Sequence, residues 1–457
     1  MPENSIWHYQ QHMNIVYIHT HDSGRCLEPY GYAVPTPNLM KLAEQSTLFR
    51  HCYCAGPTCS PSRAALLTGT WPHVNGMTGL AHFGGFALKD PNMHLARYLR
   101  TQGYETVLCG IQHEAADSND IGYNRILQDT WGTDMAIPDI ERTDEQAAAL
   151  AAEYLCKRKG QDSFFFLSVG FFCTHRDFSA DDSWGIQGEK VRQEYILPPF
   201  TLYDCQENRE DMAGYIRSAA VADRCVGIVL DAIKEAGLEN NTLIIFTTDH
   251  GIAFPHMKCS LYDSGIGVAL MVRYPGNPTA GTAADALVSH IDLFPTLCDL
   301  CGLEKPGWLQ GASLTDILHG KTDKVNEQVY SEVTYHASYE PMRCIRTKRY
   351  KLIRRYDYHL GIVPANIDQG PGKNFLIDNG IMHRPVAREM LFDLYLDPME
   401  RENLVGDSAY LEIYNDLSGR MSKWMEDTND PLTSVLHRVP APPDAMVFKL
   451  EDKGEYE

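Results

Sequence analysis

Residues 14–24 read Asn-Ile-Val-Tyr-Ile-His-Thr-His-Asp-Ser-Gly, a short apolar run with β-branched side chains that gives way at once to polar groups. Such a run is typical of a buried strand. Two further runs of this kind, Phe164–Phe172 and Thr242–Thr247, also lead into polar residues. Segments with helical periodicity separate the runs, and this alternation predicts an α/β fold with a mainly parallel sheet.

The segments between the strands carry the start and stop signals of helices. A helix is expected over Thr36–Gln45, and the Ala-rich segment Thr143–Lys157 opens with Thr143-x-x-Gln146, a capping-box pattern. A longer helix is expected over Arg209–Ala236, where Gly237 ends it. We therefore expect a large, mixed but mainly parallel sheet sandwiched between helices.

The sequence changes character near residue 325. Short runs with strand propensity follow one another there, and a closing helix precedes a polar tail. The predicted elements are the strands Val329–Val333, Met342–Arg346, Tyr350–Arg354 and Met390–Asp393, and the helix Ala409–Asp427. We expect a catalytic α/β domain over 1–325 and a smaller α+β domain, with an antiparallel sheet, over 326–457.

The charge of the chain excludes some classes of partner. The 457 residues include 40 Lys and Arg against 60 Asp and Glu, a formal net charge of −20. A negative overall field is unfavourable for holding nucleic acid or an anionic membrane surface, so neither is expected as a partner. Residues 1–12 lack a secretory signal, and the thirteen cysteines lack the spacing of a disulfide scaffold. We therefore expect a cytoplasmic protein with reduced thiols.

Acidic and imidazole groups follow three of the predicted strands. They are His21, Asp22, His175, Asp249 and His250. In open α/β sheets ligands bind beyond the carboxyl ends of the strands, so these groups can meet in space. Carboxylate and imidazole are suitable ligands for a divalent cation. A single aspartate after a strand is equally well explained as a cap or turn residue, but the recurrence favours a metal site.

A second candidate site lies in the stretch Cys59-Ser-Pro-Ser-Arg-Ala-Ala-Leu-Leu-Thr-Gly69. Pro61 and Gly69 suit the start and the end of a helix. Cys59 then lies at the helix N-terminus, where the backbone amides and the helix dipole stabilise negative charge. Arg63, four residues on, shares its face. These residues predict a nucleophile that binds an anion, and the alternative is a buried thiol before an ordinary helix.

The Cys-x-Pro-Ser-Arg pattern followed by Leu-Thr-Gly resembles the signature of the type I sulfatases, the formylglycine-dependent enzymes of the alkaline-phosphatase-like superfamily. Other landmarks of that family occur in order along the chain: Gly103-Tyr104-x-Thr106 leading to His113, then His175, Asp249-His250-Gly251, Lys258 and the segment Leu394–Leu404. Within the family the chain is similar to the heparan N-sulfatase (sulfamidase) branch. That likeness rests on Asn75-Gly76-Met77, His175-Arg176 and Ser338-Tyr339-x-Pro341-Met342-Arg343.

The resemblance implies a role for each matching residue. Cys59, oxidised by a formylglycine-generating enzyme, is the nucleophile, and Arg63 holds it and the transferring group. His113, His175 and Lys258 contact sulfate or protonate the leaving group. Asp22, Asp249 and His250 bind a divalent metal, which the family resemblance implies is calcium. Whether His21 is also a ligand stays open. His336 and Arg343 are expected to contact the substrate, a sulfate ester or sulfamate of a sugar such as an N-sulfated glucosamine unit.

Two departures from the family pattern leave alternatives open. His21-Asp22 stands where many sulfatases have consecutive aspartates, so Mn²⁺ or another transition metal becomes an alternative to Ca²⁺. Ile111 stands where the family commonly has a sulfate-binding lysine. The alternative functions are a phosphate or phosphonate monoester hydrolase of the same superfamily and a non-catalytic glycan-binding relative in which Cys59 stays a thiol.

Overall fold

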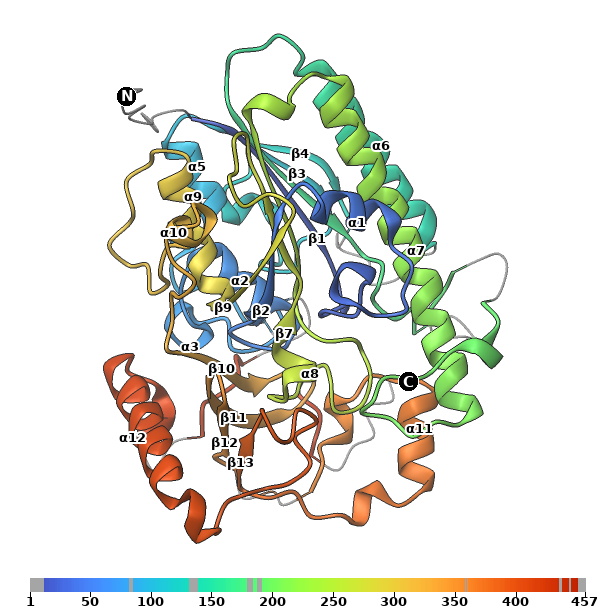
Figure 1. Ribbon diagram of the computed structural model, residues 1–457, viewed down its shortest axis with the longest axis vertical. Coiled ribbons are helices and arrows are strands. Elements are labelled where there is room, and N and C mark those ends of the chain that lie inside the picture. Colours follow the sequence, from blue (N-terminus) through green and yellow to red (C-terminus); the bar gives the residue numbers. More distant parts are fainter. Residues whose placement is uncertain are drawn as a thin grey trace, which may run out of the picture.

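The computed structural model contains two sheets, a large one with helices on both sides and a small one below it in Figure 1. The structure describes residues 12–81, 85–130, 139–178, 184–186, 191–357, 359, 361–434, 438–443 and 445–450. Residues 1–11, which contribute to the expectation of a cytoplasmic location, lie outside these ranges. Among the described helices, none combines the length and apolar character that crossing a bilayer requires.

The large sheet has nine strands in the order β4-β3-β5-β1-β6-β8-β2-β7, with β9 paired to β2. The strands are β1 (Asn14–Thr20), β2 (Thr47–Tyr53), β3 (Glu105–Gly110), β4 (Arg125–Asp129), β5 (Phe165–Phe171), β6 (Thr242–Thr248), β7 (Gly267–Val268), β8 (Leu270–Arg273) and β9 (Thr282–Ser289). From β4 to β6 all neighbours are parallel, and β8 is antiparallel to β6 and β2. The predicted mixed, mainly parallel sheet is therefore confirmed.

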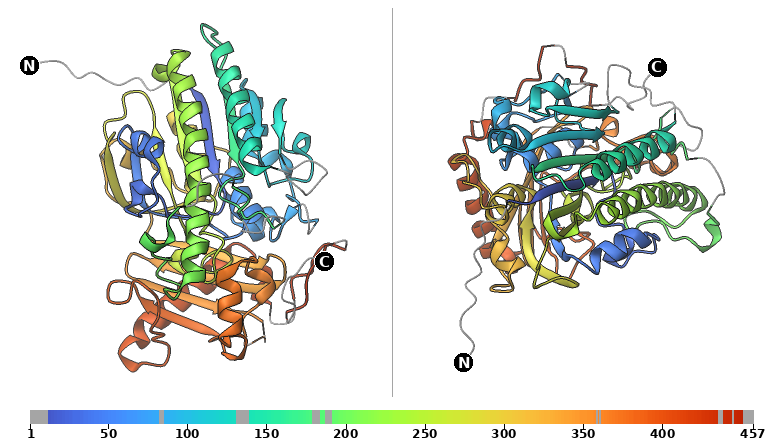
Figure 2. Two further views of the ribbon diagram at one scale, coloured as in Figure 1. Left: turned by 90° about the vertical axis from the view of Figure 1, so that its right-hand side faces the viewer. Right: turned by 90° about the horizontal axis from the view of Figure 1, so that it is seen from above.

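Helices cover both faces of this sheet (Figures 1 and 2). The helices of the chain are α1 (Pro37–Ala43), α2 (Cys59–Thr68), α3 (Pro72–Asn75), α5 (Leu95–Thr101), α6 (Ile140–Lys157), α7 (Gln206–Glu235), α8 (Asp263–Ile266), α9 (Leu293–Leu300), α10 (Thr315–Leu318), α11 (Pro371–Asp378) and α12 (Leu411–Asp427). Helices α1, α6 and α7 pack on one face, and α2, α5 and α9 on the other.

The central strand β1 shows why both faces need helices. Ile15 and Tyr17 point into the core with α2, α5 and α9, whereas Val16 and Ile18 point into the core with α1, α6 and α7. This alternation follows from the two-residue repeat of a strand, and a strand buried on both faces reads as a continuous apolar run. Each fully buried aliphatic side chain contributes about 1.5–3 kcal/mol.

The small sheet is antiparallel, as predicted, in the order β10-β11-β12-β13. Its strands are β10 (Gln328–Tyr335), β11 (Tyr339–Thr347), β12 (Tyr350–Arg355) and β13 (Glu389–Asp393), and α12 packs on it through Leu417, Met421 and Trp424. The sheet begins close to the predicted boundary at residue 325, although the division into two domains stays a prediction.

One predicted helix start is wrong. Helix α6 begins at Ile140, and its cap is Asp139, whose side chain accepts a hydrogen bond from the amide of Arg142 at 2.9 Å. Thr143 lies inside the helix, and its hydroxyl donates to the carbonyl of Asp139. An aspartate at this position provides the same capping acceptor as the predicted threonine, one turn earlier.

Candidate active site

Three neighbouring strands bring the predicted polar residues to one edge of the large sheet. Strands β5, β1 and β6 lie side by side, with Thr20 of β1 paired to Phe171 of β5 and to Thr248 of β6. Because the carboxyl ends are level, the residues that follow each strand meet there. Asp22 and Asp249 are 227 positions apart, yet the amide of Asp22 donates to Oδ1 of Asp249 at 2.9 Å.

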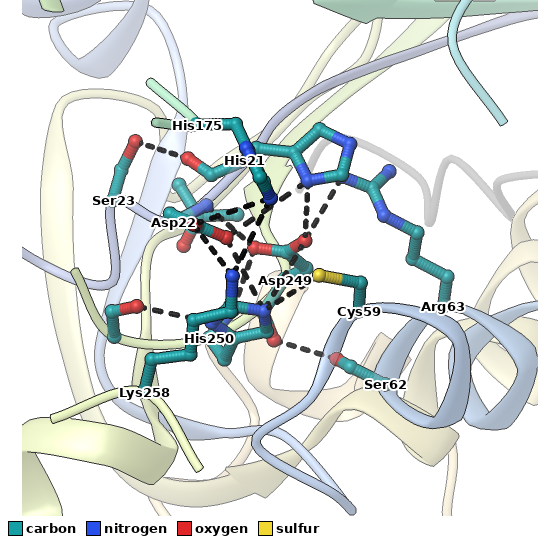
Figure 3. Close-up of polar contacts among 12 residues, drawn as sticks. His21, Asp22, Ser23, Cys59, Ser62, Arg63, His175, Asp249, His250 and Lys258 are labelled. Atoms are coloured by element: carbon teal, nitrogen blue, oxygen red, sulfur yellow. Dashed lines mark hydrogen bonds and ion pairs between the residues drawn. The ribbon is translucent and has the colours of Figure 1, made fainter. Parts of the chain in front are cut away.

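Helix α2 brings Cys59 and Arg63 to the same edge (Figure 3). The helix begins at Cys59 as expected and ends at Gly69, whose φ of 67° is the left-handed conformation that favours glycine. All ten residues of α2 are buried. The hydroxyl of Ser62 donates to the carbonyl of Asp249, which ties the first turn of the helix to the end of β6.

The Cys59 sulfur lies inside this group of residues. Its Sγ is 3.3 Å from Nε2 of His250, and that nitrogen is also 3.3 Å from Oδ1 of Asp22. Nδ1 of His250 lies 3.0 Å from the carbonyl of Gly251, so it carries the proton and donates it there. With Nδ1 engaged in this way, Nε2 is the ring atom that faces Cys59 and Asp22.

The thiol form of Cys59 is poorly suited to attack. Burial raises its pKa well above the ordinary value, and the carboxylates of Asp22 and Asp249 raise it further, against the opposing charge of Lys258. The thiolate is the nucleophilic form of cysteine. At neutral pH this side chain is therefore protonated, and a chemical change of the residue is needed to make it an effective nucleophile.

A group of buried side chains fits a divalent cation. His21, Asp22, Cys59 and Asp249 offer ligand atoms that all lie within 4.8 Å of one another. Within the described part of the chain, Oδ1 of Asp22 and both ring nitrogens of His21 make no hydrogen bond, although they are buried. Burial and the charge of Arg63 lower the pKa of His21 well below its ordinary value, so its ring is neutral. Two carboxylates and a neutral imidazole with unsatisfied acceptors form a suitable donor set.

Arg63 provides positive charge on one side of this group. Its Nη2 lies 3.0 Å from Oδ2 of Asp249, and its other terminal nitrogen hydrogen-bonds Nδ1 of His19. The side chain is only 1% exposed. A guanidinium shielded from water attracts an anion more strongly than an exposed one does.

Lys258 and His175 lie on the other side of Asp22. The Lys258 amine is 2.9 Å from Oδ2 of Asp22 and 3.5 Å from Nε2 of His175. Burial alone would raise the pKa of Asp22, but the charge of Lys258, with His175 and His250, outweighs it and lowers that pKa. Nδ1 of His175 lies 2.7 Å from the carbonyl of Arg176, to which it donates, so Nε2 faces the lysine.

Asp22 therefore divides the site into two halves. The inner half, on Oδ1, contains His21, Cys59, Asp249 and His250, while the outer half, on Oδ2, contains Lys258 and His175. The inner half holds the predicted nucleophile and the cation donors. The outer half holds a cation and an imidazole that can act on the substrate.

One residue of the outer half was missed by the sequence analysis. Asp368 places Oδ2 2.8 Å from the Lys258 amine, and it forms a compact group with Asp22 and His175. It lies between a short 3₁₀ turn, Pro364–Asn366, and α11. No strand or helical pattern precedes it, so no periodic signal could have indicated it.

The remaining predicted residues lie at different distances from this group. The ring of His113 is 6.0 Å from that of His21, centroid to centroid, and His336 lies with Nε2 3.9 Å from Oδ1 of Asp368. The structure thus brings both close to the site.

Arg343 requires a correction. Its guanidinium is fully buried and ion-paired to Glu332 at 3.1 Å and to Asp430 at 2.5 Å. It also donates to the carbonyl of Val333 at 2.9 Å. A guanidinium occupied in this way stabilises the small sheet, and the structure does not support the predicted contact with substrate.

Ile111, which stands where the family commonly has a sulfate-binding lysine, does not face the site. Ile111 follows β3 and is fully buried in the core that α6 and α7 cover. It provides no charge to the site. The buried cations in direct contact with Asp22 and Asp249 are Lys258 and Arg63.

Comparison with known proteins assigns the chain to a family of hydrolases. A family model described as Sulfatase matches residues 13–303, and a second, described as N-sulphoglucosamine sulphohydrolase, C-terminal, matches residues 252–362. The first match covers well over half of the chain, so the chain belongs to the sulfatase family. Members of this family hydrolyse sulfuric esters and sulfamates.

Named relatives share nearly the whole length. Human N-sulphoglucosamine sulphohydrolase is 29% identical over 453 residues, with 87% of each chain covered. The ulvan-active sulfatase of Formosa agariphila is 27% identical over 432 residues, covering 92% of this chain and 81% of the relative. A protein solved in complex with its substrate, D-glucosamine-2-N,6-O-disulfate, has the same fold, with a TM-score of 0.68, 19% identity and coverage of 92% and 99%.

Proposed function

We propose that this chain is a sulfatase that cleaves the sulfamate group of an N-sulfated amino sugar. The observation that carries the proposal is the position of Cys59, buried at the start of α2 between His250 and the carboxylates of Asp22 and Asp249. The match to the model described as N-sulphoglucosamine sulphohydrolase, C-terminal, supports the substrate class, because the matched residues include Lys258 of the outer half and His336, which lies beside Asp368.

Two groups would complete the site. Asp22 and Asp249, with His21, whose ring nitrogens make no hydrogen bond, would hold a divalent cation. His250, with Nε2 3.3 Å from Oδ1 of Asp22, would complete the ligand set. When bound, such a cation polarises sulfate oxygens and lowers the pKa of a nearby hydroxyl. We propose that Cys59 is converted to formylglycine, which supplies an oxygen nucleophile in place of the protonated thiol. Ca²⁺ is the expected ion by family, and the imidazoles keep Mn²⁺ as the alternative.

The side chains already present have distinct tasks. Arg63 and Lys258 are buried cations on opposite sides of Asp22 and Asp249, so a sulfate group between them is held by both charges. His175 directs Nε2 toward the same space and can carry a proton to the leaving group. Low exposure of all three side chains excludes water and strengthens these interactions.

The test is whether the protein hydrolyses the substrate once Cys59 has been converted to formylglycine. The chain is co-expressed with a formylglycine-generating enzyme, and mass spectrometry of the Cys59 peptide checks for the expected loss of about 18 Da. Matured protein is then assayed on N-sulfoglucosamine, glucosamine 6-O-sulfate and glucosamine 6-phosphate, with and without added Ca²⁺ or Mn²⁺.

Hydrolysis of the sulfamate, dependent on both the modification and a metal, is the expected result. Faster hydrolysis of the phosphate ester would replace the proposal by the phosphohydrolase alternative. An unmodified Cys59 with saccharide binding but no turnover would replace it by the glycan-binding alternative.

A further inference from the structure

Asp368 is held firmly in the outer half of the site from the side of the small sheet. The side-chain oxygen of Asn366 accepts a hydrogen bond from the amide of Ser338 at 2.8 Å, and its nitrogen donates to Glu340 at 2.9 Å. The amine of Lys373 donates to the carbonyl of Ile367 at 2.8 Å. These bonds fix the segment that carries Asp368 to the turn before β11, to β11 itself and to α11.

The same segment is also held from the side of the large sheet. Arg176, next to His175, pairs with both carboxylate oxygens of Asp211 at 2.8 Å. Gly370 packs against that guanidinium so closely that a Cβ there would come within 2.5 Å of Nη1, and the amide of Gly372 donates to Asp211. Asp368 is thus placed by contacts from both sheets.

A carboxylate at this position is unexpected beside an anion site. Asp368 lies 2.8 Å from the Lys258 amine, and its side chain is 8% exposed. A second anion in this poorly solvated space repels the oxygens of a sulfate group. A sulfate group is therefore disfavoured next to Asp368, and the part of a substrate that can approach this carboxylate favourably is the leaving group attached to sulfur.

His336 lies beside Asp368 and has a ring nitrogen that can form a hydrogen bond with a ligand. Its Nε2 is 3.9 Å from Oδ1 of Asp368, and its side chain is 8% exposed. Its Nδ1 is buried and has no hydrogen-bond partner among the residues that the structure describes. A buried polar atom without a partner is costly, so a ligand group that satisfies it is favoured.

We propose that Asp368, with His336 beside it, accepts a hydrogen bond from the leaving-group nitrogen and thereby makes the site prefer sulfamates to sulfate esters. The inference rests on the proposed sulfatase function and adds a specificity-determining residue to it. A sulfamate nitrogen carries a hydrogen that a carboxylate can accept, whereas an ester oxygen carries only lone pairs that a carboxylate repels.

The products strengthen this preference. As the bond from sulfur to the incoming oxygen forms, the sulfur–nitrogen bond breaks and its electron pair stays on nitrogen. The nitrogen takes one proton that His175 relays from water and, as a free amine, a second directly from water. The resulting ammonium is stabilised by the carboxylate of Asp368, while the alcohol released from an ester gains no such charge–charge interaction.

The test uses matured holoenzyme with Asp368→Asn, which keeps the shape and removes the charge. We expect kcat/KM for N-sulfoglucosamine to fall by about 30-fold, and kcat/KM for 4-nitrophenyl sulfate to change by less than about threefold. Asp357→Asn is the matched control, because Asp357 is similarly buried in the same sheet region but contacts Arg355. It should leave both values near wild type.

A binding measurement distinguishes a contact between Asp368 and the leaving-group nitrogen from a role of Asp368 in positioning Lys258. Glucosamine, which is an ammonium, should inhibit the wild type about tenfold more strongly than N-acetylglucosamine, and the difference should vanish in Asp368→Asn. Asp368→Glu, which restores the charge, should recover part of it.

Equal loss on the sulfamate and the aryl sulfate, with the preference for glucosamine intact, would overturn the inference, because Asp368 would then only position Lys258. If matured wild type hydrolyses neither substrate, the proposed function fails instead, and the amine comparison alone decides the role of Asp368.

Discussion

Replacing Arg343 by methionine tests whether this residue supports the fold or the substrate. The substitution removes the cation from a fully buried group in which Glu332 and Asp430 both pair with it. It leaves two carboxylates whose remaining buried partner is His73, 2.9 Å from Glu332. Removing one partner of a buried ion pair costs about 3–5 kcal/mol, because the charges left behind are not solvated.

The expected result is a large loss of stability without a loss of affinity. For a chain of this size the size trend gives roughly 1–2 °C per kcal/mol, so the loss of about 3–5 kcal/mol should lower the unfolding midpoint by about 3–10 °C. KM, measured below that midpoint, should stay within about twofold of wild type. Thermal unfolding followed by circular dichroism, together with initial rates at several substrate concentrations, gives both quantities.

A matched control is Arg420→Met in α12, the helix that packs on the same sheet. Arg420 also pairs with an aspartate, Asp416, but both side chains are exposed, 42% and 50%. Exposed pairs contribute about 0–1 kcal/mol, so the midpoint should hardly move. If Arg343→Met keeps the wild-type midpoint but raises KM tenfold or more, the structural assignment is refuted and Arg343 contacts the substrate.

Three further predictions concern the catalytic residue, a buried acid and a missing lysine. Cys59→Ala should reduce turnover to below about 0.1% while leaving the circular dichroism spectrum unchanged, and wild-type rates would exclude covalent catalysis. Burial raises the pKa of Asp144 to about 7. Its carboxylate accepts hydrogen bonds from the backbone amides of Phe172 and Cys173. An acid that holds its proton more tightly in the folded chain than in the unfolded one destabilises the fold as pH rises. The free energy of unfolding should therefore fall by about 4 kcal/mol between about pH 4 and 7 and then level off. Urea unfolding of the wild type and of Asp144→Asn across this pH range measures the difference between their free energies of unfolding. A difference that does not change with pH contradicts the prediction. Ile111→Lys should cost about 3 kcal/mol or more, because it buries an unpaired charge, and should not raise kcat/KM. Increased turnover at unchanged stability would show that position 111 can reach the substrate.

Periodic patterns predicted the central strands and the residues that follow them. Val16 and Ile18 alternate with Ile15 and Tyr17 between two apolar faces, and this is the strongest sequence signal a buried strand gives. Strand β2 was missed because Arg50 and His51 interrupt its apolar pattern, and Arg50 finds its partner, Asp285, only in the folded chain.

The parts of the site that could not be predicted depend on tertiary contacts. Asp368 lies in an irregular segment, and only its contact with Lys258 marks it. Arg343 lies on a strand that is buried along almost its whole length, where a charged side chain needs partners from distant segments. A local sequence pattern does not show whether such an arginine faces a ligand or a carboxylate of its own chain.

The two oxygens of Asp22 allow chemistry and selectivity to change separately during evolution. The groups on Oδ1 come from strand ends and from α2, where a substitution disturbs the transfer step itself. Asp368 and His336, near Lys258, come from the connections β12–β13 and β10–β11 of the small sheet, where substitutions leave the strand ends and α2 undisturbed. If Asp368 sets the preference for the leaving group, substitutions in those connections alone should change which sulfated sugar is cleaved.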